Sequence, residues 1–180
     1  VKIQKMRKEQ GLATNGQSLH MIFTGNPGTG KTTIARLVGN VLRELGVCKK
    51  GHVVEVGRSD LVGQYVGHSA PKVIDKVQEA LGGILFIDEA YSLARGGKND
   101  FGKEVIDTLV QEMENHREEL IVILAGYPKE MDDFLKLNPG LKSRFPYVFE
   151  FKDYNERELI ELFFRMAKQD DYKIDKNAIG

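Results

Sequence analysis

The sequence contains a single cysteine, Cys48, and no tryptophan among its 180 residues. One thiol excludes an intramolecular disulfide framework and a thiolate metal cluster, so a reducing compartment is favoured. No apolar run approaches the roughly 18 residues that cross a membrane, and the amino terminus has no signal-peptide core. We therefore expect a cytoplasmic protein that does not enter the membrane.

Neither sign of charge dominates, because 26 Lys and Arg balance 26 Asp and Glu. Without an overall positive field, nucleic acid is not a favoured partner. Hydrophobic residues make up 41% and charged residues 29%, which is typical of a globular chain. The length suits one domain or slightly more. The chain begins inside a basic, helix-like stretch and ends soon after a new pattern starts, so we expect a fragment of something longer.

Apolar runs of strand length alternate with segments of helical period. Residues 84–87 are apolar at every position, which indicates a strand buried on both faces, as in a parallel sheet covered by helices. The alternation predicts an α/β fold with three layers, α/β/α. The five predicted strands are 19–24, 52–56, 83–87, 120–125 and 147–151. The first helix should present one apolar face made of Ile34, Leu37, Val38, Val41, Leu42 and Leu45.

The alternation of predicted strands and helices ends after Phe151. Asn155 is placed to cap a helix rich in apolar residues, and no further strand follows. We predict a large nucleotide-binding subdomain over residues 1–152, in which 1–17 form a basic helix and linker. Residues 153–180 are then the start of a truncated helical lid, and residues 96–100 a mobile loop.

Residues 25–32 read G-N-P-G-T-G-K-T and fit the pattern G-x-x-x-x-G-K-[ST] between an apolar strand and an amphipathic helix. Glycines let successive N–H groups point at phosphate oxygens, and the following helix adds its positive dipole end. We expect Lys31 to reach the β and γ phosphates of ATP and Thr32 to ligate Mg²⁺. The alternative is a glycine turn with an incidental lysine, and the strand–helix context argues against it. The predicted binding residues are Gly25, Asn26, Pro27, Gly28, Thr29, Gly30, Lys31, Thr32, Thr33, Asp88 and Tyr127.

Two carboxylates, Asp88 and Glu89, end the buried strand at 84–87. An unpaired charge there is costly, whereas a nearby cation removes the cost. At the carboxyl edge of a parallel sheet both acids would face the same crevice as the phosphate loop. Asp88 would then position Mg²⁺ and Glu89 would polarise the attacking water. The alternative is a strand end with two solvated acids.

These residues together resemble the AAA+ ATPases. The resemblance extends to the family that contains red-type Rubisco activase and, with the greater similarity, stage V sporulation protein K. It covers roughly residues 18–171 and rests on four motifs, at residues 25–32, 60–68, 82–93 and 138–145. It implies a sheet of order 5-1-4-3-2, a homo-oligomeric ring that is hexameric at full length, and ATP-driven remodelling of a protein client.

The resemblance also assigns roles to further residues. Arg144 matches the arginine finger that reaches a neighbouring subunit, with a surface arginine or one paired to a local acid as the alternative. Tyr65, Val66 and Gly67 match the aromatic pore loop that grips a client, and the alternative is that Tyr65 packs on the preceding turn. Tyr127 stands where many relatives have an Asn or Thr that senses the γ-phosphate. Glu89, Lys31 and Arg144 are thus the predicted catalytic residues.

Other functions and sites stay open at this point. A nucleic-acid loader or motor would need a basic, aromatic-interleaved surface, for which the neutral charge gives no sign. A small-molecule phosphotransferase conflicts with Glu89, because water activated beside the γ-phosphate would waste ATP. A nucleotide-gated scaffold with negligible turnover is a further alternative. The four histidines have no metal-ligand spacing, and Cys48, near Lys49 and Lys50, is either an incidental or an activated thiol.

Overall fold

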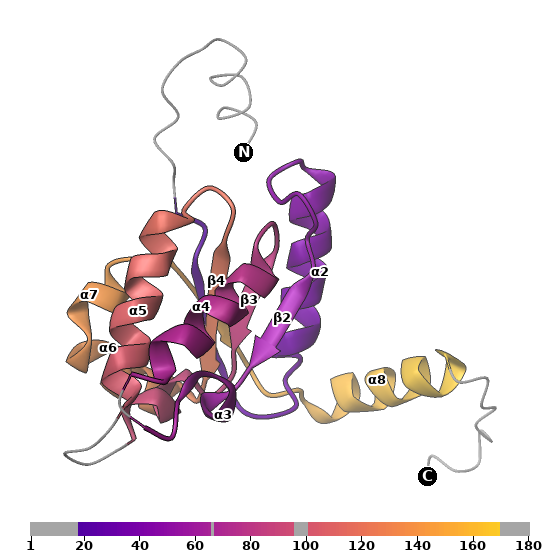
Figure 1. Ribbon diagram of the computed structural model, residues 1–180. Coiled ribbons are helices and arrows are strands. Elements are labelled where there is room, and N and C mark those ends of the chain that lie inside the picture. Colours follow the sequence, from indigo (N-terminus) through magenta and orange to yellow (C-terminus); the bar gives the residue numbers. More distant parts are fainter. Residues whose placement is uncertain (1–17, 66, 96–100, 170–180) are drawn as a thin grey trace.

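A parallel five-stranded sheet forms the centre of the computed structural model, which describes residues 18–65, 67–95 and 101–169 (Figure 1). The strand order is β2-β3-β4-β1-β5. Read from the other edge, this is the predicted order 5-1-4-3-2, so the predicted fold class is confirmed. The strands are β1 (Met21–Gly25), β2 (Val53–Val56), β3 (Ile84–Ile87), β4 (Ile121–Gly126) and β5 (Tyr147–Phe151).

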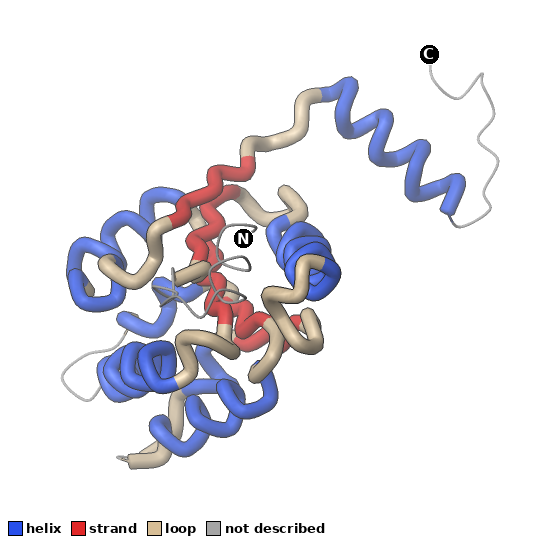
Figure 2. Tube along the Cα trace, turned by 90° about the horizontal axis from the view of Figure 1, so that it is seen from above, coloured by secondary structure: helices blue, strands red, loops and turns tan. Residues whose placement is uncertain are grey.

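Helices cover both faces of the sheet, and α2 (Lys31–Glu44) lies across the sheet from most of the others (Figure 2). The larger buried cluster joins the sheet to the helices of the opposite face, and the smaller one joins it to α2. The elements of that opposite face are α3 (Arg58–Leu61), α4 (Ser69–Ala80), the 3₁₀ helix η1 (Ala90–Ala94), α5 (Gly102–Asn115), α6 (Pro128–Leu137) and α7 (Pro139–Lys142).

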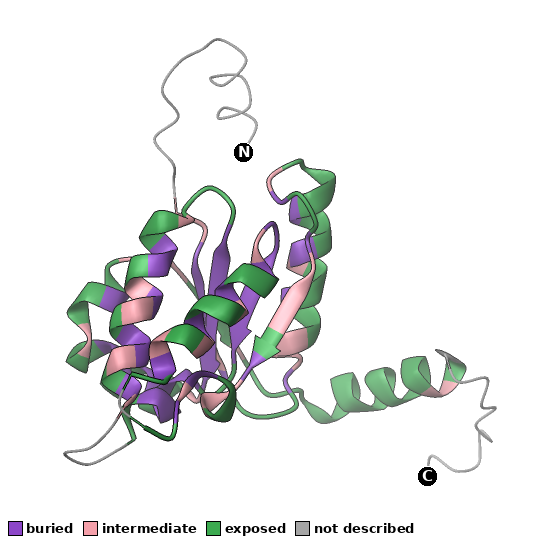
Figure 3. Ribbon diagram, viewed as in Figure 1, coloured by how far each residue is buried: buried purple, intermediate pink, exposed green. Residues whose placement is uncertain are grey.

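Strands β3 and β4 are buried at every position, as the sequence predicts for β3 (Figure 3). Both lie between other strands and are sandwiched between the two layers of helices. A continuous apolar run therefore becomes the middle of the sheet, where neither side of the strand faces water. This rigid centre fixes where the loops that follow β1, β3 and β4 begin.

Helix α2 forms where predicted, but the face that it buries differs from the predicted apolar face. Ala35, Gly39 and Leu42 are buried, whereas Leu37 and Val41 are about half exposed. Small residues decide the orientation, because α2 approaches the loop before β2 so closely that a Cβ at Gly39 would lie 2.3 Å from the Gly51 carbonyl oxygen. The apolar residues of α2 that stay more than a third exposed are Ile34, Leu37, Val41 and Leu45.

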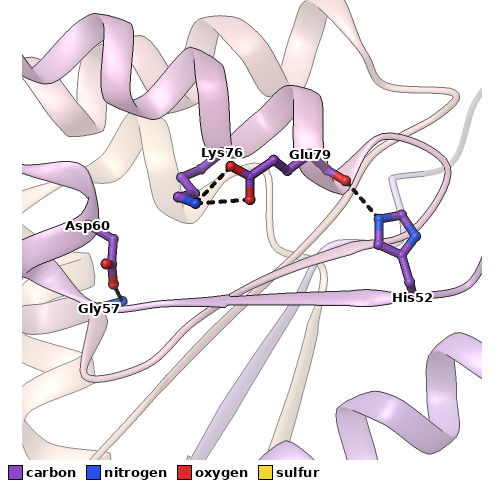
Figure 4. Close-up of polar contacts among 5 residues, drawn as sticks. All are labelled: His52, Gly57, Asp60, Lys76 and Glu79. Carbon is purple, nitrogen blue, oxygen red and sulfur yellow. Dashed lines mark hydrogen bonds and ion pairs between the residues drawn. The ribbon is translucent and has the colours of Figure 1, made fainter.

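A hydrogen bond just before the edge strand β2 fastens it to α4, and local contacts support both elements (Figure 4). His52 Nε2 lies 2.7 Å from the carbonyl oxygen of Glu79 near the end of α4, and Lys76 forms an ion pair with the Glu79 carboxylate at 2.8 Å. At the other end of β2, the Gly57 N–H donates to Asp60 Oδ2 at 2.8 Å and starts α3. Two further contacts hold the ends of the connection between α3 and α4, which carries Tyr65. The Gly63 N–H donates to Ser69 Oγ at 3.0 Å, and the Lys72 amino group donates to the Val62 carbonyl oxygen at 3.0 Å.

Helix α8 (Glu156–Gln169) begins with the predicted cap at Asn155. The Asn155 side chain accepts from the Glu158 N–H at 3.0 Å, and the Glu158 carboxylate accepts from the Asn155 N–H at 2.8 Å. Figures 1 and 2 show α8 projecting away from the sheet and its helices. The predictions for residues 1–17, 66, 96–100 and 170–180 lie outside the described residues. Within the described part of the chain, no helix is long and apolar enough to cross a membrane.

Candidate functional site

The carboxyl ends of three neighbouring strands bring the predicted site together. Strand β4 lies between β1 and β3, so the segments that follow these strands meet at one edge of the sheet. The phosphate loop follows β1, the acids follow β3 and Tyr127 follows β4. A cleft at this edge is lined by Gly25, Pro27, Lys31, Asp88, Glu89, Gly126 and Tyr127.

The phosphate loop has the backbone of an anion cradle. Gly28 and Gly30 have φ values of 77° and 88°, in the left-handed region that glycine adopts without strain. Gly30 directly precedes α2, so the loop ends at a helix amino terminus. The Lys31 amino group donates to the carbonyl oxygens of Gly25 and Asn26 at 2.9 and 2.7 Å. Lys31 is thereby held over the loop, where an incoming phosphate would meet it.

The two acids of the cleft are both exposed, although the strand before them is fully buried. Glu89 has φ 45° and ψ 46°, which makes it the one non-glycine residue with a positive φ in the described chain. Its N–H donates to Asp88 Oδ1 at 3.0 Å. A non-glycine residue in this conformation costs of order 1 kcal/mol, and such strain gathers at functional sites. Both residues line the cleft.

The oxygen donors at this edge suit a hard divalent cation. Carboxylates and hydroxyls are the ligands that Mg²⁺ prefers beside phosphate, and the chain supplies Asp88 and the half-buried Thr32 at the start of α2. Thr33, the next residue, is exposed. Tyr127 joins the lining from the end of β4, as its position in the sequence predicts. The residues present therefore fit Mg²⁺ bound together with a nucleotide.

Arg144 lies at the opposite edge of the sheet from this cleft. It precedes β5, whose first residue Tyr147 pairs with Met21 at the start of β1. Its guanidinium donates to the Gly140 carbonyl oxygen at 3.2 Å and lies 3.8 Å from the Glu114 carboxylate. The geometry therefore separates Arg144 from the cleft of its own chain and leaves it beside a local acid.

Tyr65 is 66% exposed and lies between α3 and α4. Its ring packs edge-on against His68, at 5.4 Å between centroids. Gly67 beside it has φ 80°. Val66, the middle residue of the predicted pore loop, lies outside the described residues. An exposed aromatic at this place is available for contact with another molecule.

His20 and Cys48, whose roles the sequence leaves open, are both buried in the core. His20 is buried, and burial together with the positive charge of Arg144 lowers its pKa to about 4. Its Nδ1 accepts from the Val122 N–H at 3.0 Å, so the neutral ring is part of the core. Cys48 is also buried, and burial raises the pKa of its thiol, which disfavours the reactive thiolate.

Residues 21–153 match the model of the family described as ATPase family associated with various cellular activities (AAA). This chain belongs to the AAA family. Within the AAA chain, the match spans the whole sheet and ends just after β5. The cleft described above therefore lies within the part of the chain that matches the AAA family.

The AAA chain is similar to named bacterial and algal proteins. It is 56% identical to stage V sporulation protein K of Bacillus subtilis (strain 168), over 98% of this chain and 55% of that protein. It is 48% identical to protein CbbX of Cereibacter sphaeroides, over 98% of this chain and 57% of that protein. It is 46% identical to the chloroplastic ribulose bisphosphate carboxylase/oxygenase activase of Cyanidioschyzon merolae (strain NIES-3377 / 10D), over 98% of this chain and 60% of that protein. The chain thus spans a little over half the length of these relatives.

A solved structure has the same fold. The crystal structure of the FIGL-1 AAA domain in complex with ADP aligns with a TM-score of 0.63 at 19% identity, over 94% of this chain and 55% of that one. The predicted membership of the family that holds the sporulation protein and the activases is confirmed by the relatives above.

Two residues near the site were not predicted. Asp153 accepts from the Asn26 amide, and the Tyr154 hydroxyl lies 3.3 Å from the Thr29 carbonyl oxygen. Both belong to the linker between β5 and α8. Their separation of more than 120 positions from the phosphate loop leaves no local signal in the sequence.

Proposed function

We propose that this AAA chain is the ATP-hydrolysing part of a ring-shaped motor that remodels a protein client. The observation that carries the proposal is the cleft in which Lys31, Asp88 and Glu89 meet at the end of three neighbouring strands. Membership of an ATPase family supports the chemistry. The relative named as an activase of another enzyme supports a protein client.

Each residue of the cleft has a chemical role in this proposal. The phosphate loop N–H groups and Lys31 bind the phosphates of ATP and withdraw charge from the bond that breaks. Thr32 and Asp88 hold Mg²⁺, which neutralises developing negative charge when it is bound. Glu89 accepts a proton from the attacking water, which makes that water a better nucleophile. Tyr127, which lines the cleft, would contact the terminal phosphate through its hydroxyl.

Assembly is proposed because of where Arg144 lies. It is at the edge of the sheet opposite the cleft, so it has no route to ATP within its own subunit. In a ring the same edge would face a neighbour's cleft, and the guanidinium would stabilise charge on the transferred phosphoryl group. The contact with Glu114 joins a half-buried guanidinium to an exposed carboxylate at 3.8 Å, which is long enough to exchange for that role.

Contact with the client is proposed for the exposed Tyr65. A flat, amphipathic ring gives a large contact area without demanding a particular sequence. Its exposure on a short connection between α3 and α4 supports a role in gripping an extended chain, and Gly67 supports movement of that connection.

Lys31→Ala tests the proposed nucleotide site. The variant should lose ATP affinity by at least about tenfold, because the cation that faces the phosphates is removed. Isothermal titration of the full-length protein with ATP and Mg²⁺ measures this, and circular dichroism checks that the fold is kept. Lys50→Ala, on an exposed loop away from the cleft, is the matched control. Equal affinity in wild type and Lys31→Ala would remove the phosphate-loop assignment.

A further inference from the structure

The linker between β5 and α8 is attached to the phosphate loop by two side-chain contacts. The Asn26 amide donates to both oxygens of the Asp153 carboxylate, at 3.0 and 2.8 Å. The Tyr154 hydroxyl donates to the Thr29 carbonyl oxygen at 3.3 Å. We call these four residues the linker latch. Two adjacent residues of the linker thus hold two residues of the loop that is proposed to bind phosphate.

The backbone at this place is also closely packed. Gly25 begins the phosphate loop, and a Cβ there would lie 2.4 Å from the Phe151 carbonyl oxygen at the end of β5. The linker therefore starts in contact with the loop and stays in contact through Asp153 and Tyr154. Because Gly25 lies against Phe151, and Asp153 and Tyr154 contact the loop, a movement of the phosphate loop also moves the linker.

Helix α8 depends on this linker for its position. It projects away from the body (Figures 1 and 2), and its apolar residues Leu159, Phe163 and Met166 are at least half exposed. Asn155 caps the helix immediately after Tyr154, so helix and linker are continuous. The orientation of α8 is consequently set where the linker meets the phosphate loop.

The negative charge of Asp153 makes the latch sensitive to other anions. Its carboxylate contacts Asn26 of the phosphate loop, whose glycine-rich backbone and Lys31 favour anions. A nucleotide brings several further negative charges to the same loop. Like charges close together repel, so the bound phosphates weaken the contact between Asp153 and Asn26. By thermodynamic reciprocity, a closed latch must weaken nucleotide binding to the same extent.

We propose that the linker latch couples occupancy of the phosphate loop to the orientation of α8: the latch is closed without nucleotide and opens when phosphate enters. Asp153 and Asn26 act as positioning residues, since neither needs to touch a reacting atom. The part that concerns nucleotide rests on the proposed function above. The part that concerns the nucleotide-free state rests on the contacts alone.

The first experiment measures α8 without nucleotide. Spin labels at Glu44→Cys on α2 and Lys168→Cys on α8, in a Cys48→Ala background of the full-length protein, report the distance distribution between the two helices. We expect a narrow distribution in the otherwise wild-type chain and a broad one in Asn26→Asp, where two carboxylates meet. The exchange Asn26→Asp with Asp153→Asn restores an amide–carboxylate pair and should restore the narrow distribution. Unchanged width in Asn26→Asp and in Asp153→Ala would overturn the latch.

The second experiment measures coupling with ADP, which avoids turnover. ADP should shift the label distance in the wild type, and Asp153→Ala should bind ADP up to about fivefold more tightly, as expected for one exposed charged contact. Tyr154→Phe, which keeps the ring and removes the contact to Thr29, should change affinity in the same direction. Glu156→Ala is the matched control, since it removes one exposed carboxylate from the first turn of α8.

The two experiments distinguish a failure of the latch from a failure of the proposed function. Equal tightening in Glu156→Ala and Asp153→Ala would mean that charge alone acts, and would overturn the latch. ADP binding that shifts no distance and responds to neither Asp153 nor Tyr154 would overturn the coupling while leaving the nucleotide site intact. A wild type that binds neither ADP nor ATP would overturn the proposed function, and the nucleotide-free distances would still decide whether the latch holds α8.

Discussion

His20 should make the stability of the fold depend on pH between about 4 and 6.5. The ring is 4% exposed, and its Nδ1 accepts the N–H of Val122 in the middle of the sheet. Protonation would place a second donor against that N–H and a second positive charge near Arg144 inside the core. Burial of the ring, and after it the positive charge of Arg144, lowers the pKa of His20 from 6.5 to about 4.

The direction and size of the effect follow from proton binding. Between pH 6.5 and 4 the unfolded chain binds a proton at His20 that the folded chain does not, so stability falls as the pH falls through this window. Above about 6.5 the contribution is fully present. Each pKa unit corresponds to about 1.4 kcal/mol, so the whole window is worth about 3 kcal/mol, and the step from pH 7.5 to 5.0 about 2 kcal/mol.

Urea unfolding at both pH values, with His20→Asn beside the wild type, measures this. Asparagine keeps an oxygen acceptor for the Val122 N–H but does not titrate. The variant should be less stable at pH 7.5, because it loses ring packing against Phe145. Its stability should fall by about 2 kcal/mol less than that of the wild type between pH 7.5 and 5.0. Equal losses in the two proteins would refute the reasoning, and equal slopes above pH 7 serve as the internal control.

Two predictions concern the assembled protein. Arg144→Ala should still bind ATP but lose roughly three powers of ten or more in turnover, since the arginine acts on a neighbour. For the same reason, wild-type turnover per subunit should rise with protein concentration. Full ATPase activity in a sample that light scattering shows to be strictly monomeric would contradict this. Tyr65→Ala should keep ATP affinity and assembly yet fail to remodel a client, because the gripping ring is gone; remodelling at the wild-type rate would rule out Tyr65 as the contact, with His68→Ala as the adjacent control.

The parts of the fold that follow from the sequence are those with local signals. Strand β3 is apolar at four successive positions, and the structure buries all four. The phosphate loop and the acid pair are motifs in which neighbouring residues act together, so their position at strand ends follows once the strands are recognised. Asn155 caps α8 as its residue type predicts. Each of these features is decided within about ten residues of chain.

The features that escaped prediction depend on distant neighbours. The packing face of α2 is set by Gly39 meeting Gly51, a close approach that an apolar pattern does not encode. The contact between Asn26 and Asp153 arises because β5 pairs with β1, which brings opposite ends of the domain together. The surroundings of Arg144 depend in the same way on Glu114 in α5. In each case the partner is selected by the fold rather than by the local sequence.

The central claim is that the cleft hydrolyses ATP through water activated by Glu89. The most direct measurement is phosphate release by the full-length protein and by Glu89→Gln, with ATP affinity determined in parallel. Glutamine keeps the shape of the side chain but does not accept the proton, so the variant should bind ATP within about threefold of wild type and release phosphate at least about a hundredfold more slowly. Phosphate release at the wild-type rate by Glu89→Gln would contradict the account.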